Sequence, residues 1–209
     1  MNKSILAILF LLACTPKPEP DLIETEYVPF DNGHVDEVGF FDTRITSYWI
    51  DRPTIKICPG AGITESRVRT ALSFWEDIGY TFGPITRVSH REACLPQRGE
   101  IVFRLPTQQE ITSAIEVGRL GVTKTSFSTL TRSIVTAEIF FQHIHASSKL
   151  KIVEHEIGHA LGWRHHNRKG HIMHHTLEST GWSSVGVEKR DYDQRVTDLV
   201  EGLSLGTNR

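Results

Sequence analysis

Short stretches of alternating apolar and polar residues recur through the middle of the chain. They cover residues 54–58, 85–89, 100–105, 121–125 and 134–141, with turn-forming residues between them. A period of two residues is typical of a strand that places one face on a core. The pattern therefore predicts a series of strands between residues 54 and 141.

Three other segments favour helices. Thr64 is a suitable N-cap, and the apolar residues after it recur at helical spacing as far as Ile78, which predicts a long helix with a core face. A second helix is expected over residues 148–162, and a closing helix over residues 191–203. Strands followed by two late helices favour an α+β fold over a doubly wound sheet.

Composition and charge narrow the classes of function. The chain has 209 residues, 39% of them hydrophobic and 23% charged, which is ordinary for one soluble domain with a good core. Its formal net charge is -2, and Lys and Arg are scattered along the sequence. Without a basic patch, nucleic acid is not an expected partner.

The first residues, MNKSILAILFLLAC, predict export. An apolar run over residues 5–13 is about half of the ~20 residues that a membrane-spanning helix needs, so residues 1–13 are predicted to be a signal peptide. The ending of this segment resembles a bacterial lipobox, which implies a lipid on Cys14. Thr15 after it implies the outer membrane, on the periplasmic or the surface face. The alternative is an ordinary secretion signal with Cys14 removed or free.

The lipid would be followed by a tether. Residues 14–45 are acidic and rich in proline without sustained periodicity, and the folded domain is expected over residues 46–209. Export also permits disulfides. With Cys14 assigned to lipid, Cys58 and Cys94 remain as the expected pair, and two buried free thiols are the alternative.

Histidines gather in one region, whose densest part reads HEIGHALGWRHH. On a helix, His155 and His159 leave the same face one turn apart, so both imidazoles can reach one metal ion. Leu150 belongs to the apolar residues expected on the opposite face, which would turn the two ligands outward toward a cleft. Glu156 lies beside the metal, where a carboxylate can accept a proton from water and later deliver it to a leaving amine.

Gly162 explains how a third histidine can join the first two. It follows His159 by three residues, and glycine tolerates the left-handed conformation in which many helices end. His165 can then turn back toward the same ion. A continuing helix would carry His165 to the wrong side.

All five specified positions of the pattern H-E-x-x-H-x-x-G-x-x-H are present between His155 and His165. Together with Met173 in GHIMHH, they resemble the metal site and Met-turn of metzincin zinc proteases, most closely the matrixin branch. The resemblance implies a twisted mixed sheet with a long N-terminal helix, an active-site helix, a Met-turn and a C-terminal helix. It also implies that an extended peptide substrate pairs with an edge strand, which residues 134–141 would supply.

Several features depart from the family. The tether lacks a cysteine-bearing latency motif of the matrixin kind. His175 stands two residues after the methionine, where some metzincins place a tyrosine that ligates the metal or stabilises the oxyanion, and a histidine can do either. A solvated loop histidine is the alternative. His166, His171 and His174 are expected to support the site or lie at the surface.

These observations predict a zinc-dependent endopeptidase with one catalytic Zn²⁺ held by His155, His159 and His165, and with Glu156 as general base. The expected partners are a protein or peptide substrate and a membrane reached only through the lipid anchor, and the expected state is a monomer. The alternatives are a non-catalytic zinc-binding lipoprotein, a protein that keeps the fold for recognition alone, and a peptidase that acts on cell-wall peptides.

Overall fold

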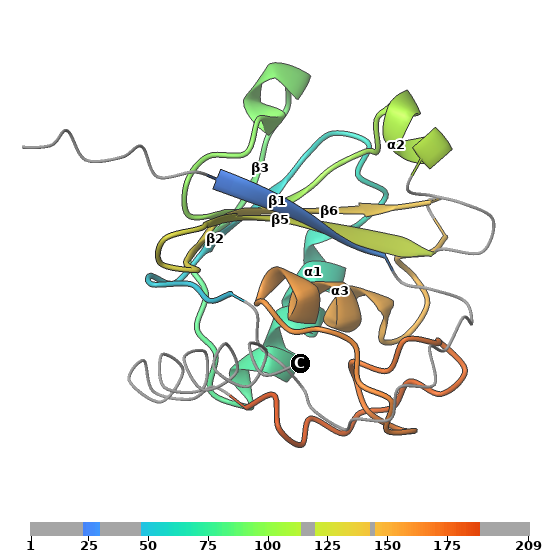
Figure 1. Cartoon of the computed structure of the whole chain (residues 1–209). Helices are drawn as coiled ribbons and strands as arrows, with labels where there is room; N and C mark the ends of the chain where they lie inside the picture. Colours follow the sequence, from blue (N-terminus) through green and yellow to red (C-terminus); the bar gives the residue numbers. More distant parts are fainter. Residues whose placement is uncertain (1–22, 30–46, 114–119, 143–144, 189–209) are drawn as a thin grey trace, which may run out of the picture.

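The protein is built on one mixed, six-stranded sheet (Figure 1). The computed structural model describes residues 23–29, 47–113, 120–142 and 145–188. The strand order is β1-β5-β6-β4-β2-β3, antiparallel from β1 to β6 and parallel from β6 to β3. The strands are β1 (Ile23–Pro29), β2 (Thr54–Ile57), β3 (Ile85–Arg87), β4 (Glu100–Phe103), β5 (Gly121–Ser128) and β6 (Ile134–Phe141).

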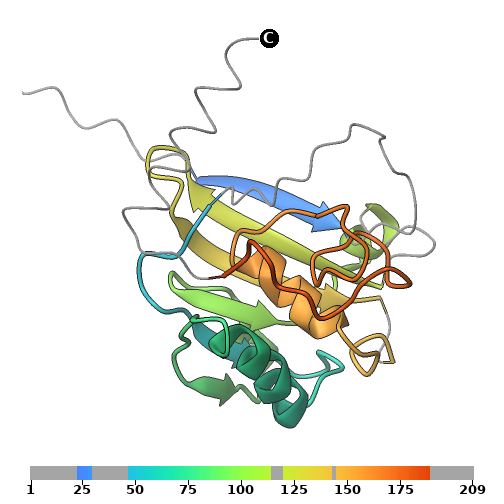
Figure 2. The same cartoon turned by 90° about the horizontal axis from the view of Figure 1, so that it is seen from below.

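Two helices cover one face of this sheet, α1 (Glu65–Glu76) and α3 (Ile152–Ala160) (Figures 1 and 2). The short helix α2 (Gln108–Ser113) lies on the opposite side. The side chain of Thr64 accepts a hydrogen bond from the backbone N–H of Arg67 at 3.1 Å, which confirms it as the N-cap of α1. The α+β prediction is therefore confirmed, and each predicted strand between residues 54 and 141 is present.

The core lies between the sheet and the two helices. Alternate side chains of β2, β4 and β6 point toward α1 and α3, and the apolar face of α1 packs against them. Among the largest fully buried side chains are Ile55, Ile57, Trp75, Ile101, Phe103, Ile139, Ile152 and Ile157. Burial of this apolar area is the main force that holds α3 in place.

Polar contacts then fix how α3 sits beside α1. The indole N–H of Trp75 donates to the backbone carbonyl of Glu154 at 2.8 Å. The guanidinium of Arg67 donates to both carboxylate oxygens of Glu154, at 2.7 and 2.6 Å, and the glutamate side chain is 3% exposed. Such a bidentate pair carries geometric specificity as well as energy, so it sets both the height and the rotation of the helix.

The helix differs from its prediction in length and exposure. It begins at Ile152, after Lys151 in a left-handed conformation, and not near residue 148. Leu150 therefore lies outside the helix and is 70% exposed, so its predicted place on the core face is wrong. All nine residues of α3 are buried, and the expected outward ligand face is wrong too. The sheet covers one side of the helix, and the chain that follows it covers the other (Figure 1).

The predicted edge strand is an interior strand. Residues 134–141 form β6, which pairs with β5 on one side and with β4 on the other, so both its hydrogen-bonding edges are used. An extended peptide cannot add to β6, and that expectation is wrong. The edge beyond β5 is occupied by β1, which lies within the region predicted as a tether. The sheet thus begins earlier in the chain than the sequence pattern indicated.

Several predictions concern residues outside the described ranges. They are the signal peptide over residues 1–13, the lipidated Cys14 and the closing helix over residues 191–203. None of the helices in the described ranges has the length and hydropathy needed to cross a bilayer.

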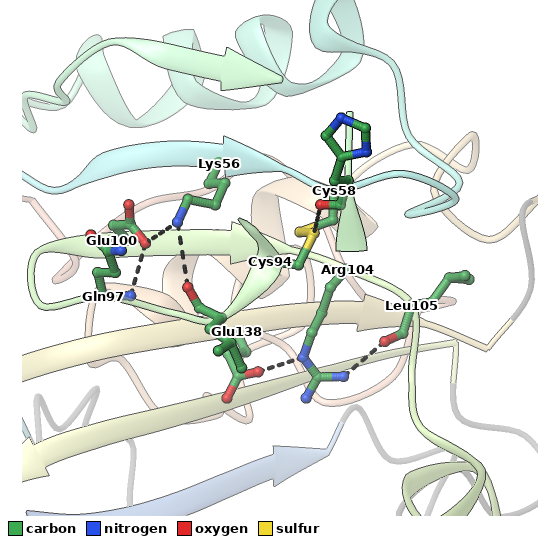
Figure 3. Close-up of a disulfide and its surroundings, with 10 residues drawn as sticks. Lys56, Cys58, Cys94, Gln97, Glu100, Arg104, Leu105 and Glu138 are labelled. Carbon is green, nitrogen blue, oxygen red and sulfur yellow. Dashed lines mark hydrogen bonds and ion pairs between the residues drawn. A yellow bond between two sulfur atoms is a disulfide. The ribbon is translucent and has the colours of Figure 1, made fainter. Parts of the chain in front are cut away.

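A disulfide joins Cys58, directly after β2, to Cys94, at the end of the 3-10 turn η1 (Arg91–Cys94) (Figure 3). The two Cα atoms are 5.7 Å apart, within the usual range for a bridge. The predicted pairing is therefore confirmed. It ties the connection between β3 and β4 to the end of β2.

We expect replacement of both Cys58 and Cys94 with serine to lower the free energy of unfolding by about 4 kcal/mol. The bridge spans 36 residues, and its loss returns loop-closure entropy to the unfolded chain. Urea unfolding of oxidised wild type and of the double variant measures the difference. Wild type under reducing conditions should match the variant, and equal stability of all three would contradict the expectation.

Candidate metal centre

Three histidines of the motif come together at the C-terminal half of α3. One ring nitrogen from each of His155, His159 and His165 lies within 4.8 Å of the other two. The Nε2 atom of His159 is 3.0 Å from that of His155 and 3.2 Å from that of His165. The structure therefore brings together all three predicted ligands, and among the described residues this is the one cluster that could hold a metal ion.

The outer ring nitrogens decide which atoms face the centre. The Nδ1 atom of His155 is 2.8 Å from the backbone oxygen of Ile172, and that of His159 is 2.6 Å from the oxygen of Trp163. A carbonyl only accepts, so each Nδ1 must carry the ring proton, as inferred from the hydrogen-bond network. Each neutral ring then presents a bare lone pair at Nε2.

The converging lone pairs of His155 and His159 suit a cation. A hydrogen bond between the Nε2 atoms of His155 and His159 would require a second proton on one ring, since both Nδ1 protons are already used. Two bare lone pairs 3.0 Å apart repel each other unless a positive ion lies between them. Tetrahedral ligands at ~2.0–2.1 Å from zinc are about 3.3 Å apart, so the observed separations fit a metal ion of this size.

Burial keeps the three rings in the form that binds metal. Desolvation lowers the pKa of His159 to about 4 and holds the pKa values of His155 and His165 well below their usual range. Neighbouring rings add to the effect at His155 and His165, because a second charged imidazole would be repelled. The rings are therefore neutral at pH 7, as metal ligation requires.

Gly162 has the role that the sequence predicted. Its φ is +97°, its N–H donates to the carbonyl of His159 at 2.9 Å, and the N–H of Trp163 donates to that of Gly158 at 3.0 Å. These two bonds form a Schellman ending, after which the chain reverses and carries His165 back to the cluster. A β-carbon at position 162 would also lie 1.9 Å from the backbone oxygen of Ser47.

Met173 packs directly against α3. A β-carbon at Gly158 would lie 2.3 Å from the Met173 sulfur and 2.7 Å from Cζ2 of Trp75, so only glycine fits at this position of the helix. Met173 is fully buried, and its neighbour Ile172 supplies the carbonyl that orients His155. The loop after the motif thus supports the metal centre through packing and through one hydrogen bond.

Glu156 is turned toward β5. Its carboxylate is fully buried, and Oε2 accepts a hydrogen bond from the hydroxyl of Thr123 at 2.5 Å. Oε1 has no hydrogen-bond partner among the described residues. Desolvation raises the pKa of Glu156 to about 8, against the lowering effect of the Thr123 bond. A cation held by the neighbouring histidines would lower this pKa again. More of the carboxyl group would then be ionised at pH 7, and the ionised form is the one that acts as a base.

The other histidines of the segment brace the loop. The Nδ1 atoms of His166, His171 and His174 accept backbone N–H groups from Arg168, Met173 and Thr176 at 3.0–3.1 Å. All three side chains are buried, so the surface placement is wrong. Their contacts are with the backbone of the loop, and a role in supporting the site stays a prediction.

His175 differs from these three. It is 8% exposed, which excludes the solvated-loop alternative, and its Nε2 has no hydrogen-bond partner within the described part of the chain. Its ring centroid lies 6.3 Å from that of His165. The structure does not include it in the ligand cluster, and its role as a fifth ligand or oxyanion group stays a prediction.

Sequence reasoning missed three groups that position the site. They are the glycine at 158, the hydroxyl of Thr123 and the carbonyl of Ile172. Gly158 stands inside a predicted helix, where a glycine is a signal of close packing, but the pattern could not name its neighbour. Nothing in the sequence could link Thr123 to Glu156, because the contact depends on how β5 crosses α3.

Comparison with known proteins adds no identification: no family model matches the chain, and neither a curated protein nor a solved structure is significantly similar to it. The geometry of the cluster and the motif itself therefore carry the functional argument.

With metal removed by a chelator, we expect the free energy of unfolding to fall as the pH drops from about 6.5 toward 4. His159 has a pKa of about 4 in the folded chain and ~6.5 when unfolded, so in this window only the unfolded state takes up a proton. The contribution of His159 to stability is thus complete above pH 6.5 and is lost on acidification. Urea unfolding across this range measures it.

The control for this experiment is His159→Gln, which removes one of the titrating rings. Its stability should fall less steeply than that of wild type over the same pH range. An identical pH dependence in the two chelated proteins would show that this ring does not titrate as the burial of the site requires.

Proposed function

We propose that the chain is a zinc-dependent endopeptidase of metzincin type. One observation carries the proposal: one ring nitrogen from each of three imidazoles lies within 4.8 Å of the other two, and Glu156 follows the first of these histidines in the sequence. The Met173 contact beneath α3 and the helix ending at Gly162 add support. A structural zinc site is usually closed by four protein ligands, whereas three leave a position for water and substrate.

Three histidines and one glutamate have separate roles in the proposed reaction. His155, His159 and His165 would hold the ion, and as neutral ligands they leave its charge uncompensated. Zinc bound in this way supplies Lewis acidity, which favours ionisation of water near neutral pH and polarises a carbonyl. Glu156 would accept the proton of the attacking water and donate it to the amine of the broken peptide bond.

The place of action and the substrate are further parts of the proposal. The signal-like segment and the lipobox-like ending at Cys14 favour a lipoprotein of the bacterial outer membrane. We expect it to act as a monomer on proteins or peptides. Cleavage of cell-wall peptides is an alternative within the same chemistry. Pairing of the substrate with β6 is not part of the proposal, because both edges of that strand are used.

A zinc reservoir is the rival from another class of function. It would use many histidines, but Nδ1 of His166, His171 and His174 each accepts a backbone N–H, and these residues belong to no second cluster within the described ranges. A reservoir also has no use for Glu156 buried beside the ligands. The enzyme is therefore the better-supported function.

We expect one zinc ion per chain, lost on substitution of any ligand. His159→Ala should reduce bound zinc to background, because two remaining imidazoles make an incomplete site. His145 is exposed and lies outside the cluster, so the control variant His145→Ala should bind one zinc ion, as wild type does. Elemental analysis after dialysis gives the ratio, and several ions per wild-type chain would favour the reservoir.

Glu156→Gln is expected to keep one zinc ion and lose cleavage of casein by roughly 100-fold or more, because the amide cannot take up the proton. The variant differs from wild type only in the acid–base group, so a normal zinc content shows that the site is intact. If the loaded variant cleaves casein as fast as wild type, Glu156 is not the base.

A further inference from the structure

We propose that strand β5 positions the general base: Thr123 holds one carboxylate oxygen of Glu156, and Gly121 leaves the space in which the other lies. Thr123 is then a positioning residue of the reaction, although it lies 33 residues before Glu156 in the chain. The inference rests on the proposed function for its kinetic consequence. Its structural part depends only on contacts between β5 and α3.

Thr123 makes two contacts with the same glutamate. Its hydroxyl oxygen is 2.5 Å from Oε2 and 3.0 Å from the backbone oxygen of Glu156. One hydroxyl group therefore spans the side chain and the backbone of the residue, which limits rotation of the carboxyl group. Thr123 is fully buried, so water does not compete for this hydrogen bond.

Gly121 shapes the other side of the carboxylate. A β-carbon at position 121 would lie 2.5 Å from Oε1, 2.9 Å from Cδ and 3.0 Å from Cγ of Glu156. The three nearest atoms all belong to the glutamate side chain. A methyl group here would thus displace the carboxylate and not the backbone of β5.

The two contacts give the carboxylate oxygens different roles. Oε2 is committed to Thr123, whereas Oε1 is buried and has no partner in the described part of the chain. A buried acceptor without a partner is costly, so Oε1 is the oxygen that would remain available to a water proton. The strand can hold this geometry because β5 is paired on both sides, Thr123 lying opposite Ile139 and opposite Val28.

Strand β5 also offers a matched control. Thr125 lies two residues further along the same face, is 4% exposed and has a hydroxyl with no hydrogen-bond partner among the described residues. Thr123→Val and Thr125→Val make the same isosteric change in the same strand. They differ in whether the lost hydroxyl contacts Glu156.

The kinetic test compares Thr123→Val, Thr123→Ser, Thr125→Val and Gly121→Ala in the full-length, zinc-loaded protein. Misplacement of a reacting group can cost about 100-fold, so Thr123→Val and Gly121→Ala should lower kcat by roughly 10- to 100-fold with KM and zinc content unchanged. Thr123→Ser keeps the hydroxyl and should recover most of kcat, and Thr125→Val should behave as wild type. A normal kcat for Thr123→Val, or an equal loss for Thr125→Val, would overturn the proposal.

Crystal structures of wild type and Thr123→Val give a readout without activity. We expect the Glu156 carboxylate to contact Thr123 in wild type and to move away in the variant. An unchanged carboxylate in Thr123→Val would overturn the positioning role. A wild type that cleaves nothing, but shows the expected shift between the two structures, would instead overturn the proposed function and its kinetic consequence, and would uphold the positioning of the Glu156 carboxylate by Thr123.

Discussion

Two hydrogen bonds from imidazole N–H groups to backbone carbonyls determine which ring nitrogens the candidate metal centre can offer to an ion. They give His155 and His159 one tautomer each and turn both Nε2 lone pairs toward the same point. The accepting carbonyls belong to Trp163 and Ile172, which follow α3 in the chain. The ligands therefore depend on the turn and the loop after the helix as much as on the helix itself, and Gly162 is required because it makes that turn possible.

A dry site of this kind needs a rigid support. The imidazoles of His155 and His159 and the carboxyl group of Glu156 are buried at low dielectric, where an error in position leaves a polar atom without a partner. The fold meets this requirement by burying every residue of α3 and fixing the helix to α1 through Trp75 and the Arg67–Glu154 pair. Such a buried pair adds little net stability, but it holds the helix in a single orientation.

The sequence predicted features that follow from local backbone geometry, and it missed features that depend on contacts between separate helices and strands. Periodicity located the strands, and the spacing of the motif located the ligands and the helix ending at Gly162, because each follows from backbone geometry alone. The interior position of β6 could not be predicted, since a strand carries no mark of its neighbours. Strand β1, which pairs with β5, was missed because it comes from an acidic segment without a clear period. The prediction for Leu150 was wrong because an apolar residue just before a helix resembles a residue of its first turn. Lys151 adopts a left-handed conformation, so the helix begins only at Ile152.

The short sequence from His155 to His159 meets three different neighbours because successive residues on a helix are about 100° apart. The two histidines point in nearly the same direction, Glu156 lies on one flank of them, and Gly158 lies on the other. The first flank meets β5 at Thr123, and the second meets Met173 and Trp75. Rotation of α3 to relieve any one contact would disturb the other two. Ligand convergence, placement of the carboxylate and packing at the glycine are therefore one constraint, and the residues of a single helical turn satisfy it together.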